Sequence, residues 1–245
     1  PMQVGDLDAF MRRMVAGATR EIELHFKGFS VTNPHKKSII RYLAEVDETA
    51  RQIGAVNTVK IENGKLHGYN TDAPGFITPL TNTYSDLRGA HASVVGAGGA
   101  ARACVYALKQ AGVDVTILAR DAAKGAAMAA EFDVRFEKPT TDSQPLTTDI
   151  LVNATPLGTK GELEEDSIAV ASELVGVQLV YDLVYNPAET KLIKEARTAG
   201  VKTLGGLDML IAQGARQFEI WTGSDAPIDE MRSAINAHLK ETYAD

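Results

Sequence analysis

A glycine-rich turn near the middle of the chain constrains its fold more than any other feature. The segment Val94-Val95-Gly96-Ala97-Gly98-Gly99-Ala100-Ala101 lies between an apolar run typical of a buried strand and an Ala-rich helical pattern. The first glycine permits a tight turn, and Gly98 lets the main chain approach a pyrophosphate at the helix N-terminus. Ala101 is small enough for close packing of helix on strand. The pattern predicts a dinucleotide-binding unit, and an ordinary glycine turn is the alternative.

From about Thr81 onward, short apolar runs alternate with helical patterns. The predicted strands are 92–95, 113–119, 149–153, 177–184 and 201–204, and the predicted helices are 100–111, 122–132 and 189–199. Such alternation is typical of a parallel sheet that helices cover on both faces. We therefore predict an α/β fold in which residues 82–205 form a Rossmann-like, doubly wound dinucleotide-binding domain.

The two ends of the chain predict a second, smaller α/β domain. Its predicted elements are a helix over 6–16 with Asp6 as N-cap, a strand over 28–32, a helix from Pro34, strands 55–62 and 65–69 joined by Asn63-Gly64, and helices 207–221 and 228–239. We predict that residues 1–81 and 206–245 form a substrate-binding domain, which the C-terminal helices complete.

Composition excludes several classes of protein. The chain has 245 residues with 25 Lys+Arg and 32 Asp+Glu, a net charge of −7 that argues against nonspecific nucleic-acid binding. The single cysteine, Cys104, excludes an intramolecular disulfide framework and fits a reducing compartment. No apolar run approaches the roughly 18 to 20 residues that span a bilayer, and no secretory signal is visible. One cysteine and 5 scattered histidines offer no metal spacing. We expect a cytoplasmic protein without metal, nucleic acid or membrane partners.

The residues after the strand 113–119 bear on the choice of cofactor. An NAD site usually has an acidic residue here for the ribose 2′-hydroxyl. This strand ends in Ala119 and Arg120, with Lys124 one turn on. A guanidinium can pair with a 2′-phosphate, so the segment favours NADP. Asp121 could still reach a hydroxyl, and a solvated helix start remains an alternative reading of Arg120 and Lys124.

Three further polar residues are candidates for chemistry. Lys36 follows a predicted strand end, Asn57 lies at the start of a predicted hairpin, and Asp72 follows that hairpin. A lysine beside a carboxylate can act as a paired proton donor and acceptor. Taken singly, each has an ordinary alternative: a surface cation, a turn residue and a helix N-cap.

Seven segments occur in a fixed order along nearly the whole chain. They are Phe29-Ser-Val-Thr-Asn-Pro-His-Lys36, Ile53-Gly-Ala-Val-Asn-Thr58, Gly68-Tyr-Asn-Thr-Asp72, Gly96-Ala-Gly-Gly-Ala-Ala101, Asn153-Ala-Thr-Pro-Leu-Gly158, Tyr181-Asp-Leu-Val-Tyr-Asn-Pro187 and Gly206-Leu-Asp-Met-Leu-Ile-Ala-Gln213. This ordered set strongly resembles the shikimate dehydrogenase family, including its quinate/shikimate branch.

The resemblance implies an activity and a role for each matching residue. The family reversibly reduces 3-dehydroshikimate to shikimate with NADPH. Lys36 matches the catalytic lysine and Asp72 its partner, while Thr32, Asn57, Tyr185 and Gln213 match residues that hold the substrate's hydroxyls. Cofactor contacts are implied for Gly96, Ala97, Gly98, Gly99, Ala100, Arg120, Lys124, Asn153, Ala154, Thr155, Leu183, Gly206 and Met209.

The chain departs from the family pattern at its start. The family begins with a strand and helix that carry a Ser-x-Ser or Ser-x-Thr pair for the substrate carboxylate, and the chain starts after that point. We expect a truncated chain or the end of a fusion with another shikimate-pathway domain, an incomplete carboxylate site, and a monomer or homodimer. A quinate or dual-specificity dehydrogenase using NAD, a nucleotide-binding relative without catalysis and an inactive fragment remain alternatives.

Overall fold

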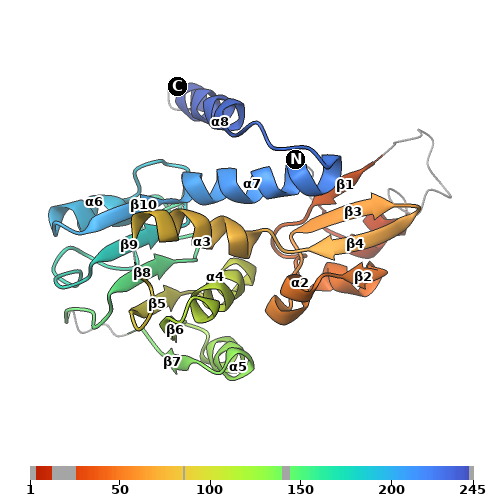
Figure 1. Cartoon of the computed structure of the whole chain (residues 1–245). Coiled ribbons are helices and arrows are strands. Elements are labelled where there is room, and N and C mark those ends of the chain that lie inside the picture. Colours follow the sequence, from red (N-terminus) through yellow and green to blue (C-terminus); the bar gives the residue numbers. More distant parts are fainter. Residues whose placement is uncertain (1–3, 13–25, 85, 140–143, 243–245) are drawn as a thin grey trace. The chain divides into compact units, whose positions relative to one another are not determined.

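The chain divides by internal packing into two compact units (Figure 1). The computed structural model describes residues 4–12, 26–84, 86–139 and 144–242, without the side chains of 240–242. The first unit comprises Pro1–Asn70 and Ile220–Thr222, and the second comprises Thr71–Glu219 and Gly223–Asp245. By packing, the segment 71–81 and most of 206–245 belong with the predicted nucleotide-binding region. The functional division at residues 82 and 205 stays a prediction.

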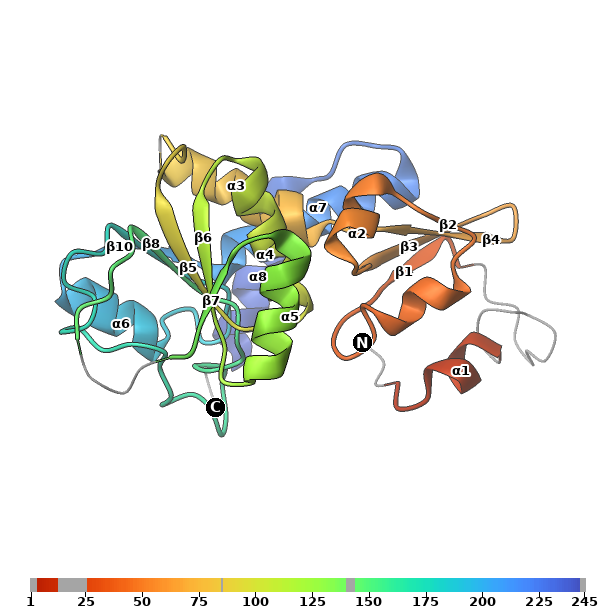
Figure 2. The same ribbon diagram turned by 90° about the horizontal axis from the view of Figure 1, so that it is seen from below.

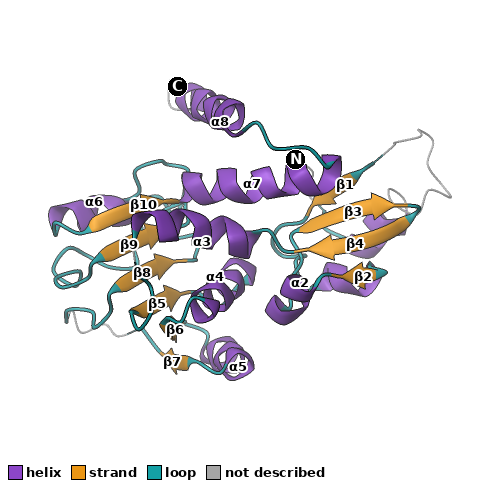
Figure 3. Cartoon of the chain, viewed as in Figure 1, coloured by secondary structure: helices purple, strands orange, loops and turns teal. Residues whose placement is uncertain are grey.

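The first unit is built on a four-stranded sheet with the order β1-β3-β4-β2 (Figure 3). Its elements are α1 (Leu7–Phe10), β1 (Gly28–Ser30), the 3₁₀ helix η2 (Ser38–Tyr42), β2 (Glu45–Val46), α2 (Glu48–Ile53), β3 (Thr58–Glu62) and β4 (Lys65–Tyr69). The predicted hairpin is confirmed: β3 and β4 pair antiparallel around Asn63 and Gly64, which have φ angles of 50° and 73°. These left-handed conformations are the ones that an Asn-Gly turn supplies.

Apolar packing on the sheet explains the core of the first unit. Val31, Ile39 and Val59 belong to one buried cluster, with Phe29 packed against it. The indole of Trp221 donates a hydrogen bond to the Val59 carbonyl at 3.0 Å. The predicted helix over 6–16 begins as expected, with the Asp6 carboxylate accepting from Ala9 N at 2.9 Å. Its continuation beyond Arg12 lies outside the described residues.

The predicted helix from Pro34 is wrong. Residues 33–37 form turns, and only a short 3₁₀ helix follows them over Ser38–Tyr42. The carbonyl of Lys36 accepts a hydrogen bond from Val56 N at 2.8 Å. In a regular helix the Lys36 carbonyl would accept from an N–H group of the same helix, but here it accepts from a distant segment. Lys36 therefore lies on a turn and not on a helix face.

The second unit is built on a six-stranded, all-parallel sheet with the order β10-β9-β8-β5-β6-β7 (Figure 1; Figure 2 shows the same sheet from below). Its strands are β5 (His91–Val95), β6 (Asp114–Leu118), β7 (Arg135–Glu137), β8 (Ile150–Asn153), β9 (Leu179–Asp182) and β10 (Lys202–Gly205). Its helices are α3 (Asp72–Thr83), α4 (Gly99–Gln110), α5 (Ala122–Phe132), α6 (Lys191–Thr198), α7 (Gly206–Thr222) and α8 (Ile228–Thr242). The predicted doubly wound sheet is confirmed.

Neighbouring residues of β9 show that helices cover both faces of this sheet. Val180 packs in a buried cluster with Leu192 of α6. The next residue, Tyr181, points to the opposite face, as alternation along a strand requires. Its ring stacks on Phe76 of α3 with ring centroids 4.9 Å apart. Strand β7 was not predicted, because it is three residues long and its outer two side chains, Arg135 and Glu137, are exposed.

Candidate dinucleotide and substrate site

The strand order brings the predicted cofactor residues to one edge of the second unit. Arg120 follows β6, Gly96 follows β5, Ala154 follows β8, Leu183 follows β9 and Gly206 follows β10. The chain runs outward from β5 to β7 and then returns to β8, so the topology switches between β5 and β8. Ligands of open α/β sheets bind outside the carboxyl ends of the strands at such a switch point.

The glycine turn lies at this switch point. Gly96 and Gly98 differ in their conformation and in the space around them. Gly96 has a φ of 124°, and a Cβ atom there would lie 2.9 Å from the Ala154 carbonyl oxygen. Gly98 has an ordinary φ, but a Cβ there would meet nothing within 4 Å. Helix α4 begins at Gly99, and its first-turn N–H groups have no intrahelical acceptors. Open space before a helix N-terminus fits a pyrophosphate.

One acidic and two basic side chains follow β6, and they differ in their contacts. The Asp121 carboxylate caps α5 by accepting from Lys124 N at 3.1 Å, and it pairs with Lys124 Nζ at 3.1 Å. These contacts, the main-chain hydrogen bond first, hold the pKa of Asp121 below its ordinary value. The side chain of Arg120 is exposed beside this cap. The arrangement fits a 2′-phosphate on Arg120, with the charge of Lys124 partly offset by Asp121.

The loops after β8 and β9 are bonded to their neighbours through the main chain. Ala154 N donates to Val95 O at 2.9 Å, and Leu183 N donates to Asn153 O at 3.1 Å. A Cβ at Gly206 would lie 2.2 Å from the Leu183 carbonyl oxygen. The start of α7 therefore packs directly on the loop after β9, and only glycine fits there. Met209, one turn into α7, is buried.

The first unit brings three predicted substrate-site residues onto two bonded segments. Thr32 and Lys36 lie on the turn after β1, and Asn57 immediately precedes β3. Val31 N donates to Asn57 O at 2.7 Å, and Val56 N donates to Lys36 O at 2.8 Å. Asn57 is buried, Lys36 is half-buried and Thr32 is exposed. Polar groups from distant parts of the sequence thus share one place in this unit.

The second unit contributes the remaining predicted residues. Asp72 is the first residue of α3 and is buried, and its pairing with Lys36 stays a prediction because the two belong to different units. The alternative role as N-cap is not observed, since Thr71 occupies that position. A Cβ on Gly75 would lie 2.6 Å from Gln213 Cβ, so α3 and α7 cross closely. Tyr185, in the loop after β9, is 43% exposed.

One buried polar residue at this edge was not predicted to be functional. Asp182 ends the otherwise apolar strand β9 and has no exposed surface. Its carboxylate accepts hydrogen bonds from Asn153, the last residue of β8, and from Val184 in the loop after β9. A carboxylate at the end of an apolar run is a visible sequence signal, but its partners come from separate segments.

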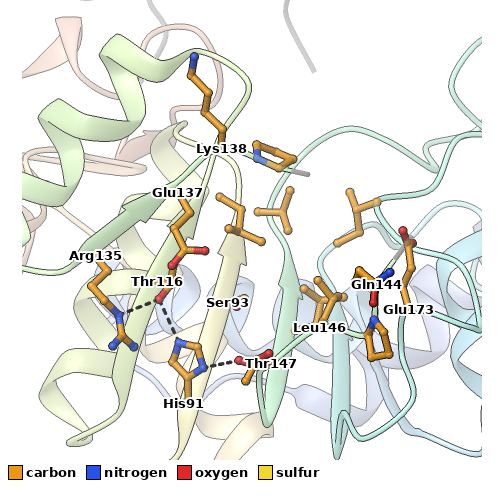
Figure 4. Close-up of a pocket in the computed structure, with 16 residues that line it drawn as sticks. His91, Ser93, Thr116, Arg135, Glu137, Lys138, Gln144, Leu146, Thr147 and Glu173 are labelled. Atoms are coloured by element: carbon orange, nitrogen blue, oxygen red, sulfur yellow. Dashed lines mark hydrogen bonds between the residues drawn. The ribbon is translucent and has the colours of Figure 1, made fainter. Parts of the chain in front are cut away.

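Each unit also contains a cavity. In the second unit, a cavity of about 520 Å³ lies over the face of β5, β6 and β7 (Figure 4). Its polar residues bond to one another: His91 Nε2 lies 3.0 Å from Thr116 Oγ1, and Arg135 Nε donates to the same hydroxyl at 3.2 Å. In the first unit, a mainly apolar cavity of about 710 Å³ lies beside Phe29 and Thr32.

Within the ranges that the structure describes, no group of three or more His, Cys, Asp and Glu side chains could hold a metal ion. Among the described helices, none is long and apolar enough to cross a membrane.

The doubly wound parallel sheet, the glycine turn at its switch point and the basic end of β6 define a dinucleotide-binding α/β protein. Two family models match: the shikimate dehydrogenase substrate binding domain over residues 8–59 and the shikimate 5'-dehydrogenase C-terminal domain over residues 206–235. Shikimate dehydrogenase (NADP(+)) of Methanopyrus kandleri is 39% identical over 236 residues, which cover 91% of this chain and 81% of the relative. The chain belongs to the shikimate dehydrogenase family.

Solved structures agree with this membership. The shikimate 5-dehydrogenase of Thermus thermophilus in complex with NADP(H) and shikimate is 38% identical, with a TM-score of 0.78 over 87% of this chain and 79% of that one. A chorismate mutase/shikimate 5-dehydrogenase fusion protein from Clostridium acetobutylicum is 32% identical, with a TM-score of 0.79 over 87% of this chain and 78% of that one.

Proposed function

We propose that the protein catalyses the NADP-dependent, reversible reduction of 3-dehydroshikimate to shikimate. The observation that carries the proposal is the row of glycine, basic and small residues along the carboxyl ends of β6, β5, β8, β9 and β10. The row has the composition that a dinucleotide needs, and it occurs in a chain of the shikimate dehydrogenase family.

The cofactor half of the site rests on two groups. Arg120 would pair with the 2′-phosphate, because a guanidinium matches the geometry of a phosphate. The open position at Gly98 and the start of α4 would take the pyrophosphate. The set that we assign to the cofactor also includes Lys124, the rest of the segment 96–100, Asn153, Ala154, Thr155, Leu183, Gly206 and Met209.

The chemical half of the site needs a proton donor. Bound NADPH supplies a hydride to the ring carbonyl carbon of the substrate. Lys36 would protonate the carbonyl oxygen as it gains charge, and we assign Asp72 as the partner of the lysine. Proton transfer of this kind contributes about 10² to 10⁴ in rate.

The substrate is a small polyol acid, whose hydroxyls need polar partners. Thr32, Asn57, Tyr185 and Gln213 would supply them. A buried hydroxyl left without a partner costs roughly 1 to 3 kcal/mol, so these residues select for the hydroxyl pattern of the ring. The single cysteine suits a cytoplasmic enzyme. A monomer or homodimer is our expectation for its assembly.

Steady-state kinetics test the proposal. Shikimate and quinate are each assayed with NADP⁺ and NAD⁺, and we expect the highest kcat/KM for shikimate with NADP⁺. Lys36→Ala should lower kcat by about 10² to 10⁴ without changing the Kd of NADP⁺. The matched control is Lys37→Ala, because Lys37 is the adjacent, exposed lysine and its side chain caps no helix. Unchanged turnover in Lys36→Ala would disprove the catalytic assignment.

A quinate or dual-specificity enzyme that uses NAD is the second candidate. Its basis is the acidic residue Asp121 at the end of β6, because a carboxylate in this region can accept from a ribose hydroxyl. For that role its oxygens would have to exchange their present contacts with Lys124. Faster turnover of quinate with NAD⁺ than of shikimate with NADP⁺ would establish this candidate instead.

A further inference from the structure

The Asp182 carboxylate is a fully buried charge-bearing group outside the residues assigned to chemistry. It lies at the end of β9 with 0% of its surface exposed. Burial of a carboxylate is costly unless hydrogen bonds compensate for lost water. Three donors surround it: Asn153 Nδ2 at 2.9 Å, Val184 N at 3.0 Å and Thr190 Oγ1 at 2.6 Å.

The first two donors belong to different segments. Asn153 is the last residue of β8, where the loop after this strand begins, and Val184 lies in the loop after β9. Both donate to the same atom, Asp182 Oδ1. One carboxylate oxygen therefore joins the start of one loop to the main chain of the other. The second oxygen accepts from Thr190, the N-cap residue of α6.

Asn153 also holds the loop after β8 through its side-chain amide. Its Nδ2 also donates to Leu157 O at 3.0 Å, and its Oδ1 accepts from Thr155 N at 3.0 Å and Thr155 Oγ1 at 2.7 Å. The contact with Asp182 selects which end of the amide faces β9, because only Nδ2 can donate to a carboxylate. A rotated amide would lose the bonds to Thr155.

The loop after β9 contacts the start of α7 directly. Gly206 N donates to Val184 O at 3.3 Å, and a Cβ at Gly206 would lie 2.2 Å from Leu183 O. The loops that we assign to the cofactor thus share one buried hydrogen-bond acceptor, Asp182.

We propose that Asp182 is a positioning residue that, through Asn153 and the main chain of Val184, holds the two loops at the spacing NADP requires. The inference rests on the proposed function, since it needs the loops after β8 and β9 to contact the cofactor. Asp182 itself touches neither cofactor nor substrate in this mechanism.

The experiment compares four variants by the Kd of NADP⁺, kcat, the KM of shikimate and thermal stability. Asp182→Ala removes the common acceptor, and we expect the Kd of NADP⁺ to rise and kcat to fall, each by about 10- to 100-fold, with a smaller change in the KM of shikimate. Asp182→Asn keeps an oxygen for Asn153 and Val184, so we expect both values within about threefold of wild type.

Thr148→Val is the matched control for a purely structural effect. Thr148 is buried at the opposite end of β8, where its hydroxyl donates to Ile150 O at 3.0 Å and His91 O at 3.1 Å. We expect this variant to lose stability without a change in the Kd of NADP⁺. Asp182→Ser gives the same readout if Asp182→Ala does not fold, because a serine hydroxyl is too short to reach both loops.

Two results would overturn the inference. One is an Asp182→Ala or Asp182→Ser protein that melts earlier, as Thr148→Val does, yet binds NADP⁺ like wild type. The other is an Asp182→Asn protein as impaired as Asp182→Ala, which would assign the effect to charge rather than to loop spacing. Failure of the proposed function is separate, because wild type would then not oxidise shikimate with NADP⁺.

Discussion

Two adjacent residues at the end of β6 illustrate what decides cofactor choice at the scale of single side chains. Arg120 and Asp121 carry opposite charges and follow one another in the chain. The sequence alone leaves open which would meet the ribose. In the structure the Asp121 carboxylate accepts a hydrogen bond from the main-chain N–H of Lys124 and pairs with the Lys124 ammonium group. Its carboxylate is therefore already used, and Arg120 is the group that remains exposed beside it.

We predict that Arg120→Ala weakens NADP⁺ binding and leaves NAD⁺ binding nearly unchanged. A charge-assisted hydrogen bond contributes about 1.5 to 3 kcal/mol, so the Kd of NADP⁺ should rise roughly 10- to 150-fold. Titration of both cofactors by fluorescence or calorimetry measures this. Arg88→Ala is the control, since Arg88 is an exposed arginine just before β5, at the opposite edge of the sheet. Equal losses for the two cofactors would show that Arg120 does not contact the 2′-phosphate.

At the scale of elements, the crossing of α3 and α7 sets the distance between the helices that carry two proposed site residues. Asp72 begins α3, and Gln213 lies on α7 opposite Gly75. A Cβ at Gly75 would lie 2.6 Å from Gln213 Cβ and 2.9 Å from Gln213 N. Main-chain atoms cannot rotate away as a side chain can, so the absence of a side chain at position 75 sets the distance between the helices.

We predict that Gly75→Ala destabilises the protein by about 1 to 3 kcal/mol, because α7 must move to admit the methyl group. Gly214→Ala is a matched control from the adjacent position of α7, where the new Cβ would meet only the flexible Met231 Cε at 3.2 Å. Alanine is favoured over glycine inside a helix by roughly 1 kcal/mol, so this control should be neutral or stabilising. Chemical denaturation measures both, and similar effects from the two variants would contradict the close crossing.

Elements also differ in how well the sequence predicts them. Strands β5, β6, β8, β9 and β10 and helices α4, α5 and α6 were predicted because each has a legible apolar period. Helix α3 was not among the predicted elements. Strands β2 and β7 are two and three residues long and have no such period. The helix expected from Pro34 failed for another reason: Val56, distant in sequence, bonds to the Lys36 carbonyl.

The pH dependence of stability is a property of the whole molecule to which Asp182 contributes. Burial raises the pKa of Asp182 above its ordinary value of 3.8, although hydrogen bonds from Thr190, Val184 and Asn153 oppose the shift. The folded protein therefore holds a proton on this group at a pH where the unfolded chain has released it. The contribution of Asp182 to the free energy of unfolding must fall as pH rises from about 4 through the raised pKa.

We predict that the stability of wild type relative to Asp182→Asn decreases with rising pH over this window and is constant above it. The asparagine does not titrate, so subtraction removes the effect of the other carboxyl groups. Denaturation of both proteins at a series of pH values gives the difference. A difference that grows in favour of wild type as pH rises would show that the three donors outweigh the cost of burial.

The sequence by itself determined the alternation of strands and helices, the glycine turn and the identity of the polar candidates. These depend on local period and on backbone chemistry within a few residues. Only the tertiary structure decided that α3 and most of α7 pack with the parallel sheet, that Lys36 lies on a turn, and that Asp182 joins two loops. Each of those depends on contacts between segments far apart in the chain, and no pattern within either segment specifies its partner.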